Sequence, residues 1–102
     1  MSKRAHHYRL TLEHLADAKP DQAPHAPLTL EFDNHDNIFS IVERMQQANY
    51  LPPSDAAELA LGIKLLGEVL LRHRDHPLFS ELGPAFREFM PKLKAQGKPA
   101  GE

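Results

Sequence analysis

The fold is decided by residues 54–73, which read SDAAELALGIKLLGEVLLRH. Apolar residues recur in this stretch at steps of four, three and four, the spacing of one helical face: Leu59, Ile63, Leu66 and Leu70. Charged residues follow at steps of four on the opposite side: Lys64, Glu68 and Arg72. Ser54 or Asp55 can accept hydrogen bonds from the free amides of the first turn. The stretch therefore predicts a long amphipathic helix that marks the core.

The composition indicates one soluble domain, 1–102, with an ordered core of about 7–94 and loose ends. Twelve basic and 14 acidic residues give a net charge of -2, which argues against a nucleic-acid binder. No apolar run approaches the roughly 20 residues that span a bilayer, so we expect no membrane association. The basic N-terminus lacks the apolar segment of a secretory signal, which favours a cytoplasmic location. The absence of cysteine excludes disulfides, thiolate metal sites and a cysteine nucleophile.

Two stretches alternate apolar and polar residues with the period of a half-buried strand, residues 7–15 and 28–33. The intervening residues 16–27 carry three prolines, which block a helix. A parallel pairing needs a crossover of a dozen or more residues, usually helical. We therefore predict an antiparallel hairpin with a long loop.

Helical spacing of apolar residues begins again at Ile38, with Asn34 or Asp36 as the expected cap and Asn49 as the expected end. A third helical region follows Asp75, and Pro91 predicts a kink or break within it. Two strands followed by three helices predict an α+β fold of order ββααα, with the helices packed on one face of the hairpin.

Three groups of motifs carry a resemblance to a known family: HDNIF with IVE at 35–43, LGIKL with EV at 61–69, and RDHPLF with PAF and FM at 74–90. Over about residues 7–94 the chain resembles DUF3861, small bacterial proteins catalogued only as a domain of unknown function. The resemblance implies an α+β fold of this order and a bacterial cytoplasmic source. It implies no activity and no site residues.

The seven histidines are the main candidates for chemistry. His73 and His76 have a spacing at which two imidazoles on a helix can share zinc or nickel. Pro77 disfavours that helix, and neighbouring arginines oppose a cation. His6 and His14 share a strand face but lie about 26 Å apart, too far to share an ion.

The pair His35-Asp36 could be a base with an orienting carboxylate, although capping explains Asp36 more simply. The serines lack the glycines of a nucleophile elbow, and Gly62 and Gly67 lie within a helix, so they form no phosphate loop. We predict no catalytic, cofactor-binding or metal-ligating residue, and no cofactor.

Apolar residues outside the predicted core faces indicate a surface for interaction: Phe39, Leu61, Leu65 and Phe79. The preferred hypothesis is a non-catalytic interaction or accessory protein that binds a protein partner or itself, as a homodimer. The helices are its expected contact, because charges along the strands solubilise the sheet. The alternative is a small-molecule or metal-binding protein, or a minor enzyme, that uses His35, His73 or His76.

Overall fold

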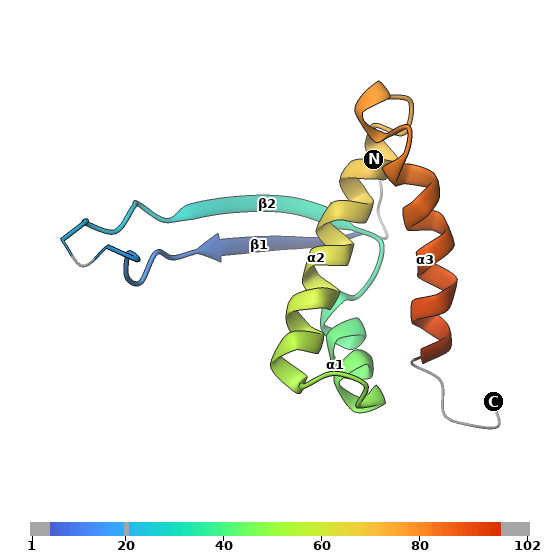
Figure 1. Cartoon of the computed structure of the whole chain (residues 1–102), viewed down its shortest axis with the longest axis horizontal. Helices are drawn as coiled ribbons and strands as arrows, with labels where there is room; N and C mark the ends of the chain where they lie inside the picture. Colours follow the sequence, from blue (N-terminus) through green and yellow to red (C-terminus); the bar gives the residue numbers. More distant parts are fainter. Residues whose placement is uncertain (1–4, 20, 97–102) are drawn as a thin grey trace. The chain divides into compact units, whose positions relative to one another are not determined.

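The computed structural model describes residues 5–19 and 21–96, with the side chain of residue 96 left out. Its elements follow the predicted order, two strands and then helices (Figure 1): β1 His6–Leu12, β2 Leu28–Asn34, α1 Ile38–Ala48, α2 Pro53–Arg72, the 3₁₀ turn η1 Pro77–Phe79, and α3 Leu82–Gln96. The α+β class is therefore confirmed. The chain divides between His35 and Asp36 into two compact units, a hairpin unit and a helical unit.

The hairpin unit is an antiparallel pair whose register separates apolar from polar residues. One face carries the pairs Tyr8–Phe32, Leu10–Leu30 and Leu12–Leu28. The other face carries His7–Asp33, Arg9–Glu31 and Thr11–Thr29. Alternation places side chains on opposite faces, so the sequence pattern fixes this register. The first strand ends at Leu12 and not near residue 15, because the prolines and polar residues of the loop follow.

Ion pairs cross the polar face of the hairpin. His7 Nδ1 lies 2.6 Å from Asp33 Oδ1, and its Nε2 lies 3.2 Å from Glu31 Oε1. Arg9 also reaches Glu31, with Nη2 2.9 Å from Oε2. The hydrogen bond with Asp33, and then that with Glu31, raises the pKa of His7 above its usual 6.5.

In the helical unit, α1 is capped at both ends by asparagine. The Asn37 side chain accepts from the Ser40 amide at 3.2 Å, so the predicted caps Asn34 and Asp36 were wrong. The extended backbone of Asn37 aims its side chain at the first turn, as an N-cap requires. Asn49 ends the helix in the left-handed region, with φ 62°, which confirms the predicted end.

The α2 helix begins at Pro53, and no side chain caps it, so the predicted capping by Ser54 or Asp55 was wrong. Proline suits this position because its missing N–H would have no helical partner there. The predicted charged side also differs, because Lys64 is half-buried and pairs with Asp36 at 2.6 Å.

The buried face of α2 keeps two residues of the predicted stripe, Ile63 and Leu70, which are 8% and 7% exposed, and adds two alanines. Ala56 and Ala60 are 0% and 1% exposed, whereas Leu66 is 38% exposed. The two alanines join Met45 of α1 in one core cluster, because their small side chains let the helices approach closely. Partly buried residues pack around that cluster: Ile41, Val42, Tyr50, Leu51, Leu59 and Leu93.

The α3 helix runs antiparallel beside α2 (Figure 1). It continues through Pro91, so a break near Met90 was wrong. Pro91 is exposed, where the loss of one backbone hydrogen bond costs least. A Cβ at Gly67 would lie 3.3 Å from ring carbons of Phe86, so this glycine permits the close approach of α3. Gly62 has open space around it and serves no such contact.

Candidate functional site

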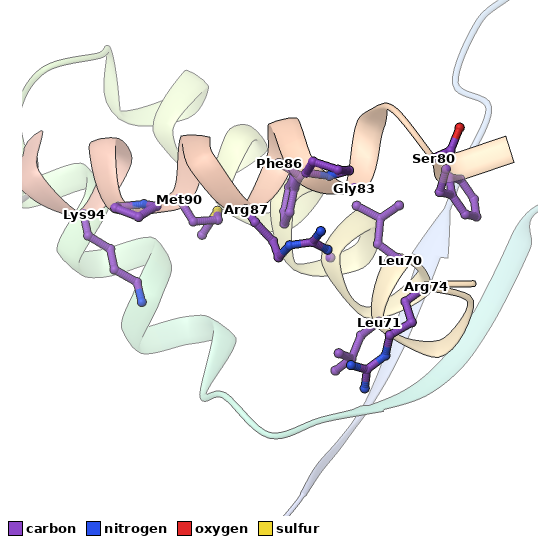
Figure 2. A pocket seen from close by; sticks show the side chains of 13 residues that line it. Leu70, Leu71, Arg74, Ser80, Gly83, Phe86, Arg87, Met90 and Lys94 are labelled. Atoms are coloured by element: carbon purple, nitrogen blue, oxygen red, sulfur yellow. The ribbon is translucent and has the colours of Figure 1, made fainter. Parts of the chain in front are cut away.

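A groove of about 510 Å³ lies between α2, η1 and α3 of the helical unit (Figure 2). We call it the α2–α3 groove. Gly67 and Phe86, where the two helices approach closely, both line it. Its lining comes from all three elements and the turns beside them: Gly67, Leu70, Leu71, Arg74, Phe79, Ser80, Gly83, Pro84, Phe86, Arg87, Met90, Pro91 and Lys94.

Apolar side chains make up most of that lining. Leu70 is buried, Phe86 and Met90 are half-buried, and Leu71 is 55% exposed. Leucine and methionine adapt their shape to a contacting group, and methionine is the most flexible apolar side chain. The groove can therefore take an apolar group from another molecule and remove Leu71 from water.

Three cations stand among these apolar groups: Arg74, Arg87 and Lys94. None of the three forms an ion pair with another residue of 5–19 or 21–96. No acidic residue of the described chain lines the groove. Figure 2 shows Arg74 and Arg87 near Leu70 and Leu71, with Lys94 farther along α3. The groove therefore combines apolar side chains with positive charge that no acidic residue of the described chain neutralises.

Of the four residues predicted as an interaction surface, one lines the α2–α3 groove. Phe79 is half-buried and lines the groove. Leu61 and Leu65 are half-buried instead of projecting fully from α2. Phe39 is 72% exposed and lies outside the groove lining.

The histidines of the alternative hypothesis are all exposed. His76 Nδ1 accepts from the Leu78 amide at 3.0 Å, so this side chain caps η1. His73 ends α2 through its backbone. Within the described chain, His35, His73 and His76 belong to no cluster of three metal-ligating side chains.

The hairpin loop holds such a cluster, formed by His14, Asp17 and His25. Sequence reasoning missed it because it compared His14 only with His6. The hairpin register gave only part of the signal. Two residues beyond the last strand pair, Leu12–Leu28, position 14 comes opposite position 26, so the backbone of His25 lies near His14. Alternation in an extended strand would place the two rings on opposite faces, so their meeting depends on the conformation of the loop.

The architecture defines a class, the small α+β domains in which a hairpin precedes three helical segments. The chain belongs to the family described as "Domain of Unknown Function with solved-structure structure (DUF3861)", which matches residues 6–95. It is similar to a crystal structure at 2.20 Å of a protein of unknown function from Pectobacterium atrosepticum. The identity is 33%, the TM-score is 0.76, and the match covers 89% of this chain and 98% of that one.

These comparisons confirm the resemblance found in the sequence and the fold it implied. No curated protein matches the chain. In the described residues, no helix combines the length and apolar character needed to cross a membrane.

Proposed function

We propose that this protein is a non-catalytic binding protein whose α2–α3 groove takes an acidic, amphipathic segment of a partner protein. One observation supports the proposal above all: three cations that form no ion pair with another residue of the described ranges lie beside an apolar lining. A segment with apolar side chains on one face and carboxylates beside them complements both features. The recognition is that of an amphipathic helix laid in a groove.

The apolar part of the contact supplies affinity. Leu71 is more than half exposed, and Phe86 and Met90 are only half-buried. Full burial of a leucine- or methionine-sized side chain contributes roughly 1.5–3 kcal/mol, and each partner side chain that enters the groove adds a similar amount. Two or three such anchors suffice for a specific contact of modest affinity.

The charged part of the contact supplies selection. The chain as a whole has a net charge of -2, so the local positive charge of the groove is opposite in sign to that of the molecule. A partner with carboxylates at matching positions is steered toward the groove, and a basic segment is repelled. Because the three cations are exposed, added salt should weaken this selection.

A pair of synthetic peptides tests the proposal. The first carries leucines at helical spacing with glutamates between them, and the second has lysine in place of every glutamate. Fluorescence anisotropy should show saturable binding of the acidic peptide alone, and the affinity should fall as salt is raised. Equal binding of both peptides, or binding of neither, would overturn the proposal.

Two charge reversals on α3 locate the contact. Arg87→Glu changes a groove cation and should weaken binding of the acidic peptide. Lys92→Glu makes the same change in charge on the same helix, at an exposed residue outside the groove lining. Equal loss in the two variants would show that the peptide senses only the overall charge.

Self-association is a second proposal, and its contact lies outside the α2–α3 groove. Phe39 is the most exposed of the four residues predicted for the contact, and the half-buried Leu61 and Leu65 offer less surface. Light scattering should give a dimer mass at micromolar concentration, and Phe39→Ser should lower it to that of a monomer. A monomer mass for the unaltered protein would refute self-association while leaving the peptide experiment to decide the groove.

A further inference from the structure

We propose that the loop of the hairpin unit binds a zinc ion through His14, Asp17 and His25. Each residue offers one ligand atom, and the three atoms lie within 4.8 Å of one another. Two imidazole nitrogens and one carboxylate oxygen are ligands that zinc prefers, and they leave a fourth position for water. The site belongs to the hairpin unit and is independent of the function proposed for the α2–α3 groove.

The spacing of the first two ligands fits a shared ion better than a direct hydrogen bond. His14 Nε2 and Asp17 Oδ2 are 3.7 Å apart, beyond hydrogen-bond length. Two ligands at about 2.0–2.2 Å from a tetrahedral zinc lie roughly 3.4 Å apart. A movement of a few tenths of an ångström therefore lets both atoms coordinate one ion.

Burial sets these two side chains apart from the rest of the loop. The side chains of His14 and Asp17 are 25% and 24% exposed. Every other described residue between the strands, from 13 to 27, is exposed. A histidine and a carboxylate that are shielded in an otherwise exposed loop indicate a built cluster.

Backbone amides position two of the ligands in the loop before zinc binds. The His25 amide donates to His14 Nδ1 at 2.8 Å, and the Lys19 amide donates to Asp17 Oδ1 at 2.9 Å. The rings of His14 and His25 stack with their centroids 5.1 Å apart and their planes 18° from parallel, so one ring must turn before both can coordinate the same ion. Pro24 fixes the backbone next to His25, which lowers the entropy lost on binding.

The hydrogen bond from the His25 amide fixes which ring nitrogen of His14 carries the hydrogen, and zinc binding must reverse this arrangement. Nδ1 of His14 accepts that bond, so the single proton of the neutral imidazole resides on Nε2. Zinc takes the lone pair of Nε2, and the proton moves to Nδ1. A protonated Nδ1 can no longer accept from the His25 amide, so this amide must find a new partner. Zinc binding therefore has a local signature at the backbone of residue 25.

Calorimetric titration of the untagged, full-length chain with zinc chloride tests the site. We expect one equivalent to bind with a dissociation constant in the micromolar range. Asp17→Asn and His25→Gln should each weaken binding at least about tenfold, since changes even to groups behind the ligands cost 10–100-fold. Both replacements keep the backbone amides that close the loop, so the hairpin should remain folded.

His73→Gln is the matched control, because it removes an exposed imidazole outside the cluster and should leave the affinity unchanged. In ¹⁵N-correlated spectra, the His25 amide should shift strongly on zinc addition. The proposal is overturned by absence of binding in the micromolar range. It is also overturned by affinity that survives either ligand variant, by equal loss in His73→Gln, or by an unmoved His25 amide.

Discussion

Truncation of two leucines on α2 tests where the core of the helical unit lies. Leu70 is 7% exposed, whereas Leu66, about one turn earlier on the same helix, is 38% exposed. Leucine-to-alanine replacement removes three carbons, worth about 2.4 kcal/mol of transfer free energy when fully buried. Scaled by the buried fraction of each side chain, this loss is about 2.2 kcal/mol for Leu70→Ala and about 1.5 kcal/mol for Leu66→Ala.

A cavity adds to the cost at Leu70 only. The space left there lies against Gly67 and Phe86 at the floor of the groove, so the helices cannot readily fill it. Because the groove is open to water, we take a cavity contribution near the lower end, which brings the total to about 3 kcal/mol. Leu66 is 38% exposed, so water can enter the space left by its truncation and no closed cavity forms, and the two variants should differ by about 1.5 kcal/mol.

Urea unfolding followed by far-ultraviolet circular dichroism reports on the helices directly. With a denaturant slope of about 1.5 kcal/mol per molar for a domain of this size, the two midpoints should lie about 1 M apart. Leu70→Ala should have the lower midpoint. Equal midpoints, or a lower midpoint for Leu66→Ala, would show that the buried face of α2 is assigned wrongly.

Three further outcomes follow from the structure. Gly62→Ala should raise the free energy of unfolding, measured with urea, by about 0.5–1 kcal/mol, because a Cβ there meets nothing and alanine favours helix. Gly67→Ala should raise the free energy of unfolding by less, because its Cβ would press on the ring of Phe86. The raised pKa of His7 means that its contribution to hairpin stability is full below 6.5 and is lost as pH rises through the raised value; Asp33→Asn should bring the pKa measured by NMR back toward 6.5. Asn37→Ala should lower the urea midpoint by an amount equivalent to about 1 kcal/mol through loss of the α1 cap, and an unchanged midpoint would show that this cap is dispensable.

The sequence predicted the order of elements well because alternation and helical spacing are local properties. It predicted the buried face of α2 in part, since Ile63 and Leu70 are buried as expected but Leu66 is 38% exposed. Large leucines dominate an apolar pattern, and this pattern favoured Leu66. The close approach of α1 instead selects small residues, and Ala56 and Ala60 became the most buried. The spacing of apolar residues along α2 does not show which other helix packs against it, because that depends on the tertiary structure.

The groove could not be predicted from the sequence, because it also depends on which helices pack together. Phe79 was predicted as a candidate, but Arg74 and Arg87 line one surface only because α3 lies beside α2. Residues far apart in sequence then present one mixed surface. The loop cluster was only partly accessible, because the hairpin register brings the backbone of residue 25 near residue 14. The stacking of the two rings depends on the loop conformation, which the sequence pattern does not contain.

Pro91 gives α3 two parts that differ in their resistance to opening. Proline has no amide hydrogen, so the helical hydrogen bond to the carbonyl of Arg87 is missing. In amide hydrogen exchange, the turn after Pro91 should open more often than the turns before it. Lys94 stands on that weaker turn, whereas Arg74 and Arg87 precede the proline. In the binding proposed for the groove, the Lys94 ammonium can therefore adjust to a partner carboxylate more freely than the Arg87 guanidinium.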